Sequence, residues 1–279
     1  MPELPEVEIV KEKLKPLVNK TASYFWNNWP RGLKVAKNAE YVSRDIAERR
    51  VIKVWRQGKA LLIGLSSKNG KKADIERILA FHLRMSGRLG FNNEDLKHIH
   101  ATVGFTDGSK LYFNDPRKFG VIWYSAPEEV MKENYFSKLG PDARGIKFKY
   151  FEERLREHRG MIKPLLLRQD FVAGIGNIVA DETLWEAKIH PKKLIEGLNP
   201  ANIKRLYLAL QKVLERGIKS GGATLRDWKN PNGKSGNFQK YVKVYGRKGE
   251  ACPRCDDRIE RITAAGRGTW ICPKCQKLK

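Results

Sequence analysis

The stretch Ala251-Cys252-Pro253-Arg254-Cys255, followed by Ile271-Cys272-Pro273-Lys274-Cys275, holds all four cysteines of the 279-residue chain. Two CxxC pairs separated by residues 256–271 have the ligand spacing of a structural Zn²⁺ site, because each tight turn directs two thiolates at one tetrahedral ion. Two disulfides are the alternative, which a chain with no signal peptide and no further cysteine disfavours. The sequence therefore predicts one structural Zn²⁺ bound by Cys252, Cys255, Cys272 and Cys275.

Between the cysteine pairs the sequence indicates a short β-hairpin. Residues 258–262 and 268–271 are typical of two strands, and Ala264-Ala265-Gly266-Arg267 is typical of the turn that joins them. We therefore expect the C-terminus to be a zinc-stabilised hairpin with Arg267 at its tip.

The charge of the chain indicates its class of partner. Lys and Arg number 55 against 31 Asp and Glu, which gives a formal net charge of +24 and a pI near 9.9. This excess suits a polyanion, with nucleic acid favoured over the roles of a ribosomal-type or membrane-surface protein. The sequence has no apolar run of about 18 residues that could span a bilayer. We expect a soluble, monomeric protein in the cytoplasm, associated with the nucleoid through DNA binding.

Hydrophobic periodicity divides the rest of the chain into two halves. Residues 51–125 contain short apolar runs separated by turns such as Asp107-Gly108, which is typical of an antiparallel sandwich or barrel. An apolar stripe from Ile203 to Ile218 recurs at helical spacing after Asn199-Pro200. We expect an α+β multidomain protein, with a linker near residues 130–148.

The N-terminal segment Met1-Pro2-Glu3-Leu4-Pro5-Glu6-Val7-Glu8 precedes an apolar repeat at helical spacing. Removal of Met1 would leave Pro2 with a free secondary amine at the positive end of that helix, where its pKa falls below the α-amino value of about 7.7 to 8.0. A neutral amine of this kind can act as a Schiff-base nucleophile. On these residues alone, an ordinary helix start with a proline at each bend is the simpler interpretation.

Six segments, taken in order, carry a resemblance across almost the whole chain. They are MPELPEVE at the N-terminus, QGKALL, HLRMSGRL, NDPRKFG, VAGIGNIVADE, and VYGRKGEACPRC with CPKCQ at the C-terminus. In this order they resemble the formamidopyrimidine-DNA glycosylase family. The resemblance implies an N-terminal β-sandwich domain with a leading helix over 1–133, a helix–two-turns–helix domain over 149–240 and a zinc finger over 241–279.

The resemblance also implies an activity. A member of this family is a repair enzyme that binds damaged double-stranded DNA, excises oxidised purines such as 8-oxoguanine and formamidopyrimidines, and cuts the strand by β,δ-elimination. Pro2 would attack C1′ of the damaged nucleotide, Glu3 would manage protons at the sugar, and Lys59 would contact a phosphate. The implied catalytic residues are Pro2, Glu3, Lys59 and Arg267.

The remaining matching positions imply contacts with DNA. Met85, Arg117 and Phe119 match a trio that fills the gap left by an everted base. The segment Gly174-Ile175-Gly176-Asn177 opens a predicted helix near Ile178, so its amides can hold a phosphate, and Arg267 would grip another. The implied DNA-binding residues are Glu6, His82, Met85, Arg117, Phe119, Lys163 and Asn177.

Two features of the sequence keep a second interpretation open. Met85 and Phe119 adjoin predicted strands and could be core residues. The Gly-rich segment 220–241 is either a flexible linker or a loop that caps the lesion. Asp170 receives no function, because Leu167-Arg168-Gln169-Asp170 departs from the family pattern, which commonly has an aspartate two residues earlier.

Two other functions compete with this prediction. An endonuclease VIII-like enzyme for oxidised pyrimidines is disfavoured by the MPELPE start, by Phe119 and by the long 220–241 segment. A non-catalytic zinc-finger DNA-binding protein would keep the charge and the cysteines but would have no need of the Pro2-Glu3 terminus.

Overall fold

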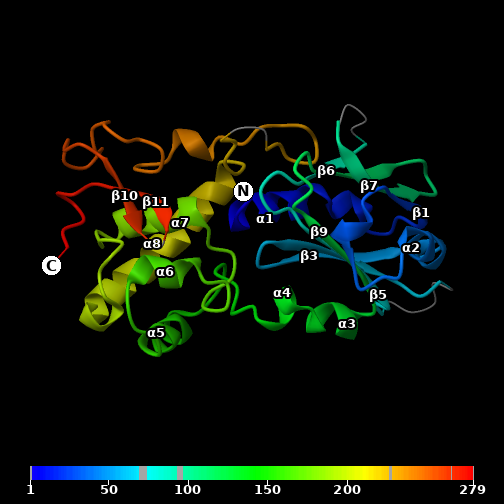
Figure 1. The fold of residues 1–279 in the computed structure, drawn as a ribbon, viewed down its shortest axis with the longest axis horizontal. Helices are drawn as coiled ribbons and strands as arrows, with labels where there is room; N and C mark the ends of the chain where they lie inside the picture. Colours follow the sequence, from blue (N-terminus) through cyan, green and yellow to red (C-terminus); the bar gives the residue numbers. More distant parts are fainter. Residues whose placement is uncertain (1, 69–73, 93–96, 226–227, 265, 279) are drawn as a thin grey trace. The chain divides into compact units, whose positions relative to one another are not determined.

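The structure is a computed structural model that describes residues 2–68, 74–92, 97–225, 228–264 and 266–278 (Figure 1). The chain forms two compact units. Unit 1 comprises Met1–Ser137 and Ser220–Asn237, and unit 2 comprises Lys138–Lys219 and Phe238–Lys279.

Unit 1 is built on two β-sheets. One sheet has the strand order β2-β9-β5-β4-β3 and the other β1-β7-β8-β6, and β2 pairs parallel to β9 while the other pairs are antiparallel. The rings of Phe81 and Phe113, one from each sheet, lie 5.6 Å apart in the shared core. The strands are β1 (Ala22–Asn27), β2 (Leu33–Lys34), β3 (Val51–Gln57), β4 (Ala60–Leu65), β5 (Arg77–His82), β6 (Arg88–Phe91), β7 (Ile99–Phe105), β8 (Lys110–Asn114) and β9 (Val121–Ser125).

The helices of unit 1 follow from local sequence signals. Glu3 and Glu6 form a capping box at the start of the first helix, and Pro5 lies in its first turn, where a missing N–H costs no hydrogen bond. Val7 and Val10 of this helix, and Leu14 directly after it, belong to the core of the sheets. The helices are α1 (Leu4–Lys13), η1 (Lys15–Leu17), η2 (Pro30–Gly32), α2 (Ala39–Ile46), α3 (Pro127–Lys132) and α4 (Asn134–Ser137).

Unit 2 is helical and ends in a two-stranded hairpin. The longest helix is amphipathic, starts after Asn199, whose Oδ1 accepts a hydrogen bond from Asn202 N at 2.8 Å, and ends before two glycines at φ 77°. The helices are α5 (Phe148–Arg156), α6 (Ile162–Leu167), α7 (Asn177–Glu186), η3 (Ile195–Gly197), α8 (Pro200–Lys219) and η4 (Phe238–Lys240), and the strands are β10 (Glu260–Ala264) and β11 (Arg267–Ile271). None of the helices among the described residues combines the length and apolar character needed to cross a membrane.

The architecture confirms the predicted β-rich first half, helical second half and C-terminal hairpin. The apolar periodicity does not indicate strands β1, β2 and β6 or helix α2, because their apolar residues are interrupted by polar ones. The hairpin prediction was shifted: β10 starts at Glu260 rather than at 258, and Arg267 is the first residue of β11, paired with Ala264. Ala265, in the predicted turn, lies outside the described residues.

Candidate active site and zinc centre

The N-terminus of α1 gathers three of the predicted site residues. Pro2, Glu3 and Glu6 are all buried in unit 1, while Met1 lies outside the described residues. The Glu6 carboxylate accepts hydrogen bonds from the backbone N–H of Glu3 at 2.8 Å and of Ala223 at 2.6 Å. Burial, reinforced by the charge of Glu3, raises the pKa of Glu6 to about 7. The helix start is therefore joined to the segment that begins at Ser220.

Lys59 lies in the turn before β4, and His82 is the last residue of the neighbouring strand β5. Lys59 belongs to the two-residue turn between β3 and β4, where Gly58 has φ 58°, and its successor Ala60 pairs with His82. Both side chains are buried. Burial, with smaller effects from Arg84 and Lys59, lowers the pKa of His82 to about 3. Because His82 Nδ1 accepts the Arg84 N–H at 3.0 Å, its ring is a neutral donor through Nε2.

Met85, Arg117 and Phe119 come together on two loops of unit 1. The Arg117 guanidinium lies over the Phe119 ring, 4.6 Å from its centroid, and its Nη1 is 3.7 Å from the Met85 sulfur. Met85 is 51% exposed and Phe119 48%, so neither is a core residue. The core interpretation of these two residues is thus wrong, and the structure offers them as an exposed apolar pair beside a cation.

Asp115 shapes the loop that carries Arg117 and Phe119. It is fully buried, and its Oδ2 accepts the N–H groups of Phe119 at 2.8 Å and Gly120 at 2.7 Å. Its Oδ1 accepts the Ser86 hydroxyl, next to Met85 on the other loop. Sequence reasoning missed this residue, although an aspartate before a proline at the end of a strand is a turn signal.

Residues 220–237 pack on unit 1. Trp228 contacts the core of the sheets, Phe91 N donates to Pro231 O at 3.1 Å, and Asn237 N donates to Ser220 O at 2.9 Å. A Cβ added to Gly236 would lie 2.1 Å from Gly222 O, so the two ends of the segment touch through backbone. Because its described residues pack against the sheets and against each other, this segment does not have the structure of a free linker. Residues 226–227 lie outside the described residues.

In unit 2, the glycine loop before α7 lies next to the zinc hairpin. Gly174 has φ 105°, and Asn177, the first residue of α7, donates through Nδ2 to Gly268 O at 3.1 Å. Gln169 holds the loop by accepting the Gly174 N–H at 3.0 Å and donating to Ile175 O at 2.9 Å. Asp170 instead forms an exposed ion pair with Arg168 at 2.7 Å. The sequence did not single out Gln169.

Lys163 is fully buried in unit 2. Its Nζ lies 2.6 Å from Asp181 Oδ1 and donates to Thr269 Oγ1 at 2.7 Å, which joins α6, α7 and β11. Asp181 Oδ2 also accepts the Trp270 N–H at 3.2 Å. Burial raises the pKa of Asp181 to about 7, although Lys163 opposes this shift. The contact of Lys163 with DNA remains a prediction. Its contacts with Asp181 and Thr269 indicate that Lys163 also stabilises the packing of α6, α7 and β11.

The four cysteines meet in unit 2 with the spacing of a metal site. Their sulfur atoms all lie within 4.8 Å of one another. The separations are 3.4 Å for Cys255–Cys272 and for Cys255–Cys275, and 4.0 Å for Cys252–Cys275. A tetrahedral ion with Zn–S bonds of about 2.3 Å separates its sulfurs by about 3.8 Å, whereas a disulfide requires about 2.0 Å. The geometry fits one four-thiolate Zn²⁺ and excludes the disulfide alternative for this conformation.

The zinc centre is anchored on α7. The apolar cluster around it contains Trp185 of α7, and the Arg254 guanidinium lies over the Trp185 ring at 3.8 Å. Gln276 is fully buried, accepts the Cys272 N–H at 3.0 Å and donates to Ile189 O at 2.9 Å. Burial raises the pKa of the Cys272 and Cys275 thiols, so a cation is needed to keep both as thiolates.

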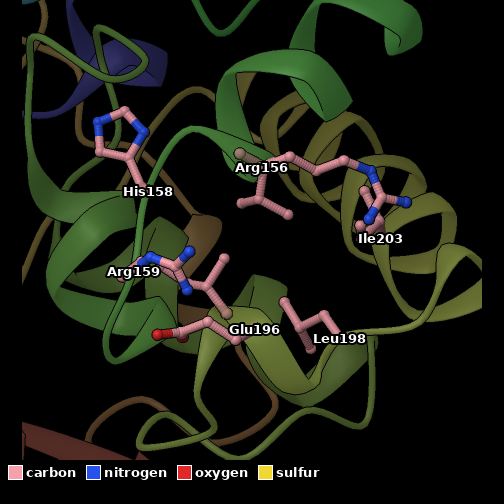
Figure 2. A pocket seen from close by; sticks show the side chains of 8 residues that line it. Arg156, His158, Arg159, Glu196, Leu198 and Ile203 are labelled. Carbon is pink, nitrogen blue, oxygen red and sulfur yellow. The ribbon is translucent and has the colours of Figure 1, made fainter.

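The exposed Arg267 lies at the start of β11, in the same hairpin as Thr269, the acceptor for Lys163. A concave pocket of about 210 Å³ elsewhere in unit 2 contains none of the predicted site residues. Figure 2 shows its lining, which combines the basic side chains of Arg156, His158 and Arg159 with Glu196 and with apolar side chains that include Leu198 and Ile203. Of the predicted DNA-binding residues of unit 2, Asn177 therefore lies at the glycine loop and Arg267 on the hairpin, whereas Lys163 is buried.

Comparisons with known proteins cover almost the entire chain. Residues 1–122 match the model of the formamidopyrimidine-DNA glycosylase N-terminal domain, residues 139–229 that of its H2TH domain, and residues 249–278 a zinc finger found in FPG and IleRS. The formamidopyrimidine-DNA glycosylase of Pelotomaculum thermopropionicum is 38% identical, with 100% of both chains covered.

Two solved structures of the Lactococcus lactis Fpg protein are similar to the chain. A complex with abasic-site DNA has a TM-score of 0.87 and 34% identity, covering 99% of each chain. A complex with N7-benzyl-Fapy-dG DNA has a TM-score of 0.86 and 34% identity, covering 99% of this chain and 100% of the other.

Proposed function

Because the chain belongs to the formamidopyrimidine-DNA glycosylase family, we propose that Pro2 is its nucleophile and that both chemical steps run through this amine. The protein is a bifunctional DNA glycosylase and abasic-site lyase that repairs oxidised purines such as Fapy-dG. The observation that carries the proposal is the position of Pro2, buried directly before the capped helix α1, next to Glu3 and Glu6.

The chemistry follows from a neutral secondary amine at this position. The Pro2 nitrogen forms a bond to C1′ while the glycosidic bond breaks, and the base leaves with a proton. Opening of the sugar ring gives an iminium ion that acidifies the C2′ proton, so the 3′ phosphate and then the 5′ phosphate are eliminated. Water finally hydrolyses the iminium and restores the amine.

Three buried groups of unit 1 support this chemistry in our proposal. Glu3 transfers protons at the deoxyribose, because it adjoins the amine in sequence and is buried. Lys59 contacts a phosphate near the lesion. His82 donates through Nε2 to a phosphate oxygen as a neutral group, since its lowered pKa keeps it uncharged.

Eversion of the damaged base requires groups that fill the gap. We infer that Met85 and Phe119 insert as apolar wedges and that Arg117 hydrogen-bonds the orphaned partner base. Their exposure and mutual contact support this role. Segment 220–237, the part of the Gly-rich segment 220–241 that belongs to unit 1, is joined to Glu6 through Ala223 and is our candidate for holding the everted base, including 8-oxoguanine.

In this proposal, residues of unit 2 bind the phosphates of the DNA backbone. The glycine loop and Asn177 at the start of α7 hold one phosphate, and Arg267 holds another. The partner is damaged double-stranded DNA, bound by a monomer that acts on the nucleoid in the cytoplasm. The Zn²⁺ supplies structure rather than chemistry, because four thiolates leave no open coordination position.

We propose the domain division 1–133, 149–240 and 241–279 for these tasks. The matched family ranges support it. Residues 220–237 belong to the second of these domains in sequence, although they are compact with unit 1.

Borohydride trapping tests the nucleophile. Incubation of the protein with a duplex that contains 8-oxoguanine, in the presence of borohydride, should yield a covalent adduct that peptide mass spectrometry locates at Pro2. Pro5→Ala serves as the matched control, because Pro5 lies in the same segment without a free amine, and it should still form the adduct. An adduct on a lysine such as Lys59, or unchanged trapping by a Pro2→Gly variant that retains Met1, would contradict the assignment.

A further inference from the structure

Lys59 lies in the two-residue turn that joins β3 to β4. Gln57 pairs with Ala60 across a two-residue turn in which Gly58 has φ 58°, the geometry of a tight hairpin turn. In such a turn the second central residue, Lys59, has a backbone N–H that points away from the strand ladder. Lys59 is buried at 5% exposure, so an N–H left without an acceptor would destabilise the turn.

The acceptor for this N–H is a side chain 76 residues further along the sequence. The Lys59 N–H donates to the Tyr135 hydroxyl at 2.7 Å. The Tyr135 ring also contacts His82, with ring centroids 4.8 Å apart, and stacks on Trp123 at 5.8 Å. One residue of α4 therefore contacts two groups of the proposed active site.

A second contact holds the same turn from the side of α1. Arg56 Nη1 donates to Gly58 O at 2.7 Å, and Arg56 Nε donates to Glu8 Oε2 at 2.9 Å. Both side chains of this ion pair are nearly fully buried. Through Arg56 the turn is attached to the helix that Pro2 precedes, and through Tyr135 it is attached to α4.

We propose that Tyr135 is a positioning residue of the active site, which fixes Lys59 and His82 relative to Pro2. Its hydroxyl holds the Lys59 backbone and its ring supports the His82 imidazole. The inference rests on the proposed function of Pro2 and Lys59. It concerns a residue outside all six segments that carried the family resemblance.

Tyr135→Phe tests the proposal, because it deletes the hydroxyl and keeps the ring on His82 and Trp123. Tyr124→Phe is the matched control. It removes a partly buried tyrosine hydroxyl of the same unit, which donates a hydrogen bond of equal length, 2.7 Å, to Asp45 Oδ2. The readout is the single-turnover rate of formation of the borohydride-trapped adduct on 8-oxoguanine duplex, measured together with the Kd for that duplex.

We expect Tyr135→Phe to slow adduct formation by about tenfold with a Kd within about twofold of the wild-type value, and Tyr124→Phe to leave the rate unchanged. In a Lys59→Ala background, Tyr135→Phe should cause little further loss, because residues that act through one another are not additive. A wild-type rate for Tyr135→Phe, an equal loss in Tyr124→Phe or a fully additive double variant would overturn the proposal. Absence of any wild-type adduct at Pro2 would instead refute the proposed function.

Discussion

At the scale of single residues, the ionisation of Glu6 is coupled to the fold around Pro2, because its buried carboxyl group accepts the backbone N–H groups of Glu3 and Ala223. Its ordinary pKa of 4.5 is raised to about 7 in the folded protein. Between these two values the folded state binds a proton that the unfolded state has lost. The contribution of Glu6 to stability is therefore fully present below about pH 4.5 and is lost as the pH rises through 7.

This linkage gives a measurable pH dependence. Compared with Glu6→Gln, which cannot titrate, the free energy of unfolding of the wild-type protein should fall by on the order of 2–3 kcal/mol between pH 5 and pH 8. Urea denaturation of both proteins across this range measures the difference. A difference independent of pH, or a ¹³C NMR titration midpoint of Glu6 near its ordinary pKa, would show that burial does not shift this carboxyl group.

The Lys163–Asp181 pair makes a second prediction at the residue scale. Lys163→Met leaves the fully buried Asp181 without its counter-ion, so we expect a loss of about 3–5 kcal/mol in the free energy of unfolding of unit 2. Lys212→Met, which breaks the partly exposed pair with Glu186, is the control and should cost below about 1 kcal/mol. Hydrogen exchange of α7 amides reports the stability of unit 2. Equal losses in the free energy of unfolding for the two substitutions would contradict a stabilising role of Lys163.

At the scale of elements, segment 220–237 should control which base is excised. Gly236→Ala would push a Cβ against the carbonyl oxygens of Gly222 and Gly221, at 2.1 and 2.4 Å, and displace the segment from its place beside Glu6. We expect excision of 8-oxoguanine to fall at least about tenfold, or roughly 1.4 kcal/mol, while cleavage of a preformed abasic site changes little.

The matched control is Gly197→Ala in unit 2, where the added Cβ meets only the flexible end of Lys193. Both activities should be retained in this variant. Equal losses in the two assays for Gly236→Ala would mean that the segment supports the fold alone, and full retention of both would make it dispensable for base selection.

At the scale of the whole molecule, the net charge of +24 predicts strong, salt-dependent binding to any duplex. Arg267→Ala should weaken binding to damaged and undamaged duplexes alike and reduce the slope of log affinity against log salt concentration by about one unit. Lys149→Ala, which removes an 89% exposed lysine from α5, is the control and should leave the slope unchanged. A loss confined to damaged DNA, with an unaltered slope, contradicts a phosphate contact at Arg267.

The sequence determined the features that depend on residues close together in the chain. The spacing of the CxxC pairs predicted the zinc ligands, because a tight turn between two cysteines is a local property, and the apolar runs predicted β4, β7 and α8 for the same reason. The matched motifs likewise identified the family, since each is a short contiguous segment.

Only the tertiary structure decided which side chains those segments present and which they bury. Met85 and Phe119 adjoin strands yet are exposed, on two loops that are both hydrogen-bonded to the buried Asp115. Lys163 is buried, with Asp181 and Thr269 from distant segments as its partners. The hydrogen bond between Tyr135 and Lys59 has the same origin. Such contacts join residues far apart in the chain, and their free energy depends on desolvation and on partners that exist only once the strands and helices have packed together.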